Sequence, residues 1–254
     1  MMMKKRLIAR LDINNEYVIK GKYLEGLRKV GKPNLLALEY YIAGIDEIIF
    51  LDAVASLYDR NSLFDIIKRA CGEVFVPLTV GGGIRSIYDI KQALSVGADK
   101  VAINSAAVRD IGFIKEAVEI FGSQAIVGSV VARKNRNYWE AFIDNAKHRT
   151  KLDAIHWAME LEKSGVGEII VSSIDKDGIQ KGFDLDLIQK VTNSVRIPVI
   201  AASGAGNPNH IVEVCKVTNC DAVAVASILH YKIAGVQEIK QVMAANNINV
   251  RILV

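Results

Sequence analysis

The 254-residue sequence has no long apolar run, and this excludes several classes of protein. No window reaches the roughly 18 apolar residues that a transmembrane helix needs. The first residues, MMMKKRLIARLDIN, carry basic side chains without the apolar segment of a signal peptide. We therefore expect a cytoplasmic protein that does not contact a membrane.

Cysteine and histidine are also scarce. The three cysteines, Cys71, Cys215 and Cys220, are odd in number and show no CxxC spacing, so neither a disulfide framework nor a zinc site is indicated. We expect buried thiols. The four histidines are widely spread, and none has a carboxylate or cysteine at metal-ligand spacing. We expect no metal and no cofactor.

Charge of one sign is not concentrated anywhere along the chain. The net charge of +4 arises from 32 basic and 28 acidic residues that are dispersed, which argues against nucleic-acid binding and leaves anionic small molecules as partners. With 51% hydrophobic residues and four prolines, the composition is that of a well-packed domain. The length suits one α/β barrel, which typically needs about 250 residues.

Short β-branched runs alternate with segments of helical length, which predicts repeated β-α units and a parallel sheet. The runs are RLIARL, EIIFL, PLTV, KVAIN, AIVGSVV, EIIVSS, PVIAA and AVAVA. Eight such units favour a (β/α)8 TIM barrel. An open doubly wound sheet usually has a GxGxxG turn after its first strand, and LDINNEYVIKGK has none.

The sequence repeats itself at a nearly constant offset. GIDEIIFLD (44–52) matches GVGEIIVSS (165–173), and VPLTVGGG (76–83) matches IPVIAASG (197–204), each 121 residues apart. ADKVAINSA (98–106) matches CDAVAVASI at an offset of 122. Three matches in the same order predict a single barrel domain, residues 1–254, built from two half-barrels, roughly 1–122 and 123–254.

The repeat also exposes one departure. The first strand ends in Asp12, and the strand that opens the second half, within QAIVGSVVAR, has Val131 at the equivalent place. Strand C-termini and the loops after them build the active site of such a barrel. Asp12 is therefore expected in the mouth, opposite an apolar counterpart.

Anion-binding groups are expected on both sides of the mouth. Glycines at 81–83 follow a strand, which lets backbone N–H groups approach a phosphate, although a plain tight turn would explain them equally well. Asn104 and Ser105 end the next strand and add polar donors. The repeat places Ser203 and Gly204, then 226–227, across the mouth. Two such sites suit a long ligand with a phosphate at each end.

Several of these segments together resemble one family. They are ARLDIN, VIKG, GIDEIIFLD, TVGGGIR, GADKVAINSAA, FGSQAIV, GEIIVSSIDKDG, SGAG and NINVRI. Over almost its whole length the chain is similar to the cyclase subunit of imidazole glycerol phosphate synthase, the barrel partner of a glutamine amidotransferase. The resemblance implies that ammonia from a glutaminase passes through the barrel and, at the mouth, cleaves and cyclises a bisphosphorylated ribulosyl nucleotide.

The resemblance also implies roles for individual residues. Asp12 matches the first catalytic aspartate, and the remaining matches at the mouth bind substrate or phosphate: Lys20, Asp52, Gly82, Gly83, Asn104, Ser105, Asp177, Gly178, Gly204, Ala226 and Ser227. Three positions depart from the family. Ile179 replaces a hydroxyl residue, Ser203 replaces a glycine, and Arg10 stands where a small residue is usual, where it should lower the basicity of a nearby Asp12.

The largest departure is Val131, which replaces the second catalytic aspartate of the family. Two facing carboxylates can divide the removal and delivery of protons, and such general acid–base catalysis is worth roughly a hundredfold to ten-thousandfold. A valine supplies neither step. Asp144 or Asp175 could substitute only if the fold brings one of them to the mouth.

Charged residues also mark the strand starts, at the opposite end of the barrel. Any one of them would suit a solvated ring of charges. As a set they match the family's salt-bridged ammonia gate: Arg6, Glu47, Lys100 and Glu168. Asp99 and Gln124 match positions of the glutaminase docking face.

Two further segments carry weaker signals. Residues 22–32, KYLEGLRKVGK, form a basic stretch expected as a loop over an anionic substrate or simply as solvated chain. Residues 138–151, after the fifth strand, are expected as a lid or hairpin.

Three functions fit these patterns. The first is a cyclase-like barrel that pairs with a glutaminase, has lost most or all cyclase chemistry, and feeds ammonia to a sugar amidotransferase of surface-polysaccharide synthesis, as the resemblance to divergent copies implies. The second is a working cyclase of histidine biosynthesis. The third is a non-catalytic activator of the glutaminase.

Overall fold

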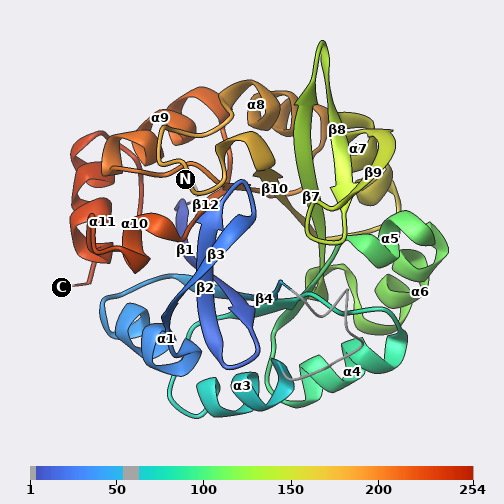
Figure 1. Cartoon of the computed structure of the whole chain (residues 1–254), viewed down its shortest axis with the longest axis horizontal. Helices are drawn as coiled ribbons and strands as arrows, with labels where there is room; N and C mark the ends of the chain where they lie inside the picture. The colour runs from blue at the N-terminus through green and yellow to red at the C-terminus, as the bar shows by residue number, and fades with distance from the viewer. Residues whose placement is uncertain (1–3, 54–62, 254) are drawn as a thin grey trace.

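The computed structural model describes residues 4–53 and 63–253, and it places eight parallel strands in a closed barrel (Figure 1). The barrel strands are β1 (Arg6–Asn14), β4 (Glu47–Asp52), β5 (Leu78–Gly81), β6 (Lys100–Ile103), β7 (Ile126–Asn135), β10 (Glu168–Ser173), β11 (Val199–Ala202) and β12 (Ala222–Val225). Pairing between β10 and β7 completes the barrel. The predicted (β/α)8 fold is confirmed.

Helices form an outer ring around this barrel (Figure 1). They are α1 (Pro33–Ile42), α3 (Leu63–Ala70), α4 (Ile87–Ser95), α5 (Ser105–Arg109), α6 (Ile111–Phe121), α7 (Ala154–Lys163), α8 (Leu185–Ser194), α9 (Pro208–Thr218), α10 (Ser227–His230) and α11 (Val236–Ala245). Two short 3-10 turns are η1 (Ser123–Ala125) and η2 (Ile174–Lys176).

Local sequence fixes where these helices begin. The Ser86 hydroxyl accepts a hydrogen bond from the Asp89 N–H, and the Asp89 carboxylate accepts one from the Ser86 N–H, so the start of α4 is a capping box. Asn207 caps α9 and is followed by a proline at the first helical position. The glycine loop at 81–83 therefore leads directly into a well-defined helix.

Alternation along β1 separates two apolar layers. Leu7, Ala9 and Leu11 pack outward in the large core beneath the helices. Ile8 instead belongs to a small cluster in the barrel interior, with Ile49, Ala102, Val127, Ile170, Ile200, Ala202, Ala222 and Ala224. Successive strand side chains point to opposite faces, so a barrel needs both layers to be filled. The interior is consequently an apolar layer between two polar ends.

Two antiparallel extensions rise from the C-terminal edge of the barrel. One continues β1 through β2 (Tyr17–Lys22) and β3 (Glu25–Gly31), so the stretch at 22–32 is mainly a strand and the expectation of a loop is wrong. The other continues β7 through β8 (Tyr138–Ile143) and β9 (His148–Asp153), which confirms the expected hairpin. In Figure 1 the β2–β3 hairpin lies in front of the barrel opening and the β7–β8 turn projects from its rim.

The cysteines differ from one another in exposure. Cys215 and Cys220 are buried as expected, whereas Cys71 is only half-buried because it lies just after the C-terminal end of α3. All three are free thiols. No helix in the described residues is both long enough and apolar enough to cross a membrane.

Candidate functional site

The mouth of the barrel holds Asp12 in an ion pair. The carboxylate is 6% exposed and accepts a hydrogen bond from Arg10 Nε at 2.8 Å, while Lys20 Nζ lies 3.5 Å away. Burial by itself raises the pKa of Asp12, but the charges of Arg10 and Lys20 outweigh burial and hold that pKa below its ordinary value. Asp12 is therefore an ionised, weakly basic carboxylate.

Lys20 extends this ion pair toward the second predicted phosphate site. Its ammonium lies 2.8 Å and 3.0 Å from the two carboxylate oxygens of Asp177. The Ser203 hydroxyl donates to Asp177 at 3.1 Å, and Ser203 has a left-handed backbone with φ of 75°. The serine that replaces a family glycine therefore keeps the backbone turn that glycine favours and adds a hydroxyl to the network.

The other predicted residues of this second site also gather here. Gly178, Gly204, Ala226 and Ser227 line a cavity of only about 20 Å³ together with Arg10, Lys20, Asp177 and Ser203. Gly204 has φ of 121°, and a Cβ there would collide with the carbonyl oxygen of Gly182. The residues are together as expected, but the space among them is small.

Val131 lies on β7 beside the mouth. Its neighbours in register are Ser172 of β10 and Phe142 of β8, and it lines the same cavity as Asp12. The two aspartates that could substitute for the missing acid are held elsewhere. Asp144 is held by Arg109 at 2.7 Å and by His148 at 3.1 Å. Asp175 accepts a hydrogen bond from the Lys134 N–H. Neither aspartate is among the described residues that line that cavity.

The first predicted phosphate site is more open. Gly82 and Gly83 have φ of 86° and 76°, and a Cβ on Gly82 would collide with the backbone of Asp52. Only glycine combines this conformation with such a close approach. The Asp52 carboxylate, at the end of β4, is 6% exposed. These three residues line a mouth cavity of about 100 Å³ that Asp12 and Val131 also line.

Asn104 and Ser105 line the same cavity and also hold the β8–β9 hairpin. Asn104 Nδ2 donates to the Phe142 carbonyl at 3.1 Å, and the Ser105 hydroxyl accepts from the Asp144 N–H at 3.0 Å. Two of the predicted phosphate-binding residues are thus hydrogen-bonded to the hairpin. The sequence pattern did not indicate this contact.

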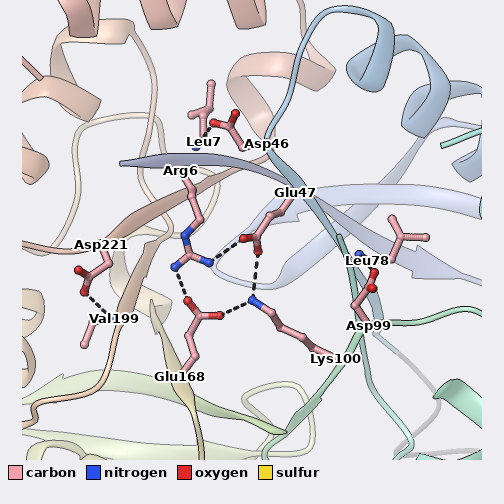
Figure 2. A network of polar contacts seen from close by, with 10 residues as sticks. All are labelled: Arg6, Leu7, Asp46, Glu47, Leu78, Asp99, Lys100, Glu168, Val199 and Asp221. Carbon is pink, nitrogen blue, oxygen red and sulfur yellow. Dashed lines mark hydrogen bonds and ion pairs between the residues drawn. The ribbon is translucent and has the colours of Figure 1, made fainter. Parts of the chain in front are cut away.

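At the opposite end, the four predicted gate residues form one network (Figure 2). Arg6 pairs with Glu47 at 2.7 Å and with Glu168, while Lys100 lies 3.0 Å from Glu168 and 3.5 Å from Glu47. The side chains come from β1, β4, β6 and β10 and point toward one another across the barrel floor. The four residues, which are far apart in the sequence, therefore meet in the fold.

Asp99 and Gln124 lie near this floor with different contacts. Asp99 accepts a hydrogen bond from the Leu78 N–H at 2.8 Å, as Asp221 does from Val199 at 2.9 Å and Asp46 from Leu7 at 2.8 Å (Figure 2). Asp99 and Asp221 stand 122 residues apart, at the repeat offset. Gln124 is exposed and lines a surface cavity of about 440 Å³ with Arg6, Lys100 and Glu168.

Two features were not indicated by the sequence patterns. A groove of about 600 Å³ between the two hairpins is lined by Arg133, Lys134, Lys147 and Arg149. Beside the mouth, buried His230 places Nδ1 2.8 Å from the Tyr40 hydroxyl, and burial lowers the pKa of His230 to about 4. Tyr40 and His230 are 190 residues apart in the sequence, and only the fold brings them together. No group of three metal-ligating side chains occurs in the described residues.

Comparison with known proteins decides the family. A family model described as "Histidine biosynthesis protein" matches residues 6–234. "Imidazole glycerol phosphate synthase subunit HisF" of Bacillus cereus (strain G9842) is 44% identical over 252 residues, which cover 99% of this chain and 100% of the relative. The chain belongs to the HisF family. A HisF of Legionella pneumophila is 52% identical over 202 residues, covering 79% of this chain and 95% of the relative.

A third HisF, from Methanopyrus kandleri, is 41% identical over 270 aligned positions and is covered almost completely. Membership of the HisF family confirms the family resemblance drawn from the sequence. The roles of the individual mouth and floor residues are predictions.

Proposed function

We propose that this HisF-family barrel receives ammonia from a glutaminase, conducts it through the barrel, and has lost most or all cyclase chemistry. One observation carries the proposal. The ion-pair network at the floor is complete, whereas at the mouth Val131 replaces an acid and Arg10 neutralises the acid that is left. The entry for ammonia is kept and the reaction chamber is altered.

The floor suits the entry of a small neutral molecule. Its four charged groups balance one another, and the apolar cluster around Ile8 and Ile170 lies directly inward from them along β1 and β10. An ammonium ion entering that apolar layer would lose its hydration without a partner, and this costs far more than moving neutral ammonia. The arrangement therefore favours ammonia over ammonium.

The mouth is poorly suited to cyclisation. Asp12 is paired with two cations and its pKa is lowered, so it is a weak proton acceptor. Val131 cannot exchange protons, and neither Asp144 nor Asp175 is placed to do so. Loss of one acid–base partner is expected to slow the reaction by roughly a hundredfold to ten-thousandfold.

A glutaminase subunit is the partner that the HisF relatives' family implies, in a heterodimer. The exposed surface around Gln124, beside the cavity that Arg6 and Lys100 line, is the proposed docking face. Asp99 supports this face from within, because its carboxylate holds the backbone of β5.

The proposed acceptor of ammonia is a sugar amidotransferase of surface-polysaccharide synthesis. The exit side offers a contact surface for it, because the groove between the hairpins carries four basic side chains against the two carboxylates of Glu25 and Glu140, an excess that would attract an acidic partner. Leu24 and Asn145 line both this groove and the mouth cavity. A protein docked there would cover the exit.

A second function is favoured by a specific observation. A relative named imidazole glycerol phosphate synthase subunit HisF is 44% identical over 252 residues, and the half of the mouth around Gly82 and Ser105 is open. A working cyclase of histidine biosynthesis is therefore the second candidate. A non-catalytic activator of the glutaminase is the third, and it needs only the floor.

The deciding experiment supplies ammonium salt and the ribulosyl nucleotide precursor to the purified chain. We expect no turnover above background, and turnover at an ordinary enzymatic rate would refute the proposal in favour of the histidine-biosynthesis cyclase. Val131→Asp combined with Arg10→Ala is expected to restore measurable turnover. No gain would mean that the chamber differs by more than these two residues.

The conduit is tested in the complex with the glutaminase. Lys100→Ala is expected to leave binding intact and to release ammonia to solvent, measured as free ammonium per glutamine hydrolysed. Lys115→Ala, on the exposed face of α6, is the matched loss of one charge and should behave as wild type. Unchanged coupling in Lys100→Ala would favour a pure activator.

A further inference from the structure

Arg10 crosses the barrel mouth from one wall to the opposite one. Nε donates to Asp12 at 2.8 Å on its own strand, and Nη1 donates to the Ser172 hydroxyl at 2.9 Å on β10. The side chain is 8% exposed and is the next inward-pointing residue of β1 after Ile8. It therefore sits on top of the apolar interior rather than at the rim.

Arg10 also divides the space of the mouth. It lines both the cavity of about 100 Å³ beside Gly83 and the cavity of about 20 Å³ beside Gly204. One water needs about 10 to 15 Å³ of such space, so the smaller cavity holds roughly one water and the larger one several. A phosphate group fits the larger cavity and not the smaller one.

The smaller half of the mouth, beside Gly204, is closed by charged side chains that are already paired with one another. Arg10, Asp12, Lys20 and Asp177 form a chain of two cations and two carboxylates, and Ser203 completes its end. An arriving phosphate would have to displace Asp177 from Lys20 and move Arg10 away from Asp12. Breaking a buried pair in this way costs on the order of a hundredfold or more in binding.

The larger half has the opposite character. Within the described residues, Nη2 of Arg10 has no hydrogen-bond partner, whereas Nε and Nη1 are both used. A guanidinium fork held by two partners is well oriented to bind an anion with its remaining N–H groups. Arg85 and Arg109 line the same cavity, where Arg109 is paired with Asp144 at 2.7 Å, and Asp52 lines it as well.

We propose that Arg10 determines the ligand specificity of the mouth: it closes the half beside Gly204 and contacts an anion in the half beside Gly83. The protein then holds a ligand through one phosphate only, and a second phosphate at the far end of the ligand adds no affinity. This inference rests on the proposed loss of cyclase chemistry and deepens it, because a bisphosphorylated precursor would be held at one end only and not positioned across the mouth.

The test compares two probes that differ by one terminal phosphate, fructose 6-phosphate and fructose 1,6-bisphosphate, by calorimetry with the full chain at constant ionic strength. Wild type is expected to bind both with Kd values within about threefold of each other. Arg10→Ala is expected to favour the bisphosphate by about tenfold or more, since one further charge-assisted contact is gained. Lys91→Ala, an exposed charge on α4, should keep the wild-type ratio.

Three results would overturn the proposal: a wild-type preference of tenfold for the bisphosphate, an unchanged ratio in Arg10→Ala, or no binding of the monophosphate by wild type. If Arg10→Ala does not fold, Ser172→Ala releases Nη1 alone and is expected to shift the ratio by about threefold, and an unshifted ratio would count against the proposal. These ratios do not depend on ammonia transfer, so they can fail independently of the proposed function.

Discussion

Both ends of the barrel carry two cations and two carboxylates, but the two sets are connected differently. At the floor, Arg6 and Lys100 each contact both Glu47 and Glu168, so the network is a closed ring. At the mouth, Arg10, Asp12, Lys20 and Asp177 are joined in series. When one residue of a closed ring is removed, every remaining charge keeps a partner. When Asp12 is removed from the linear series at the mouth, Arg10 loses its ion-pair partner.

The two networks also differ in where their residues originate. The ring takes one residue from each of four strands spread around the barrel. The linear ion-pair series at the mouth takes three residues from β1 and β2 and one from the segment after β10. A ring of this kind follows from barrel symmetry. The linear series at the mouth forms because β2 folds back antiparallel to β1. We therefore expect substitutions at the two ends of the barrel to differ in their effect on stability.

The largest effect is expected for Asp12→Ala. Arg10 would then be a buried cation without its only ion-pair partner among the described residues, and loss of one member of a buried pair costs roughly 3 to 5 kcal/mol. Urea unfolding followed by circular dichroism measures this. Because the pKa of Asp12 is lowered, its stabilisation is present above the unfolded pKa of about 3.9 and is lost as pH falls through the lower folded value. A change below 1 kcal/mol would contradict the series model.

The next effect concerns His230, the buried imidazole near the mouth. Burial lowers its pKa to about 4, so between about pH 6.5 and pH 4 the unfolded chain binds a proton that the folded chain does not. As pH falls through that window, the titration of His230 should lower the free energy of unfolding by up to about 1.4 kcal/mol per pH unit.

His230→Gln removes this titrating group, and the slope of unfolding free energy against pH should flatten between pH 6.5 and pH 4.5. Exposed His156→Gln is the control and should leave the slope as in wild type. Parallel slopes in the two variants would show that His230 is not buried in the neutral form.

A smaller effect is expected for Glu47→Ala at the floor. Arg6 and Lys100 both keep Glu168, so no cation is left alone, and the cost should be roughly 1 to 2 kcal/mol. The measurement is the same urea titration as for Asp12→Ala. Equal costs at the two ends would remove the distinction between ring and chain.

The smallest effect is expected for Glu16→Ala, which removes an exposed ion pair with Lys32 beside the mouth extension. Solvent screens such pairs, so the unfolding midpoint should stay within experimental error. This variant is the baseline for the other three, and a clear shift in its midpoint would show that the extension contributes more to stability than its exposure suggests.

Much of the fold could be predicted because its determinants are local and periodic. β-branched runs marked all eight barrel strands, and Asp12 and Lys100 could be assigned to opposite ends because strand polarity is shared in a parallel barrel. The stretch at 22–32 was mispredicted because its strand pairs with β2 through exposed residues, which give no alternating apolar pattern.

The sequence by itself determined the barrel, its family, and which position at the mouth lacks an acid, since these depend on residue type and spacing along the chain. The tertiary structure alone decided what surrounds that position. Arg10 reaches Ser172 across 162 residues of sequence, and Asp177 closes on Lys20 across 157. Those contacts depend on the strands converging at one end of the barrel. There, side chains that are distant in sequence bind one another in place of water.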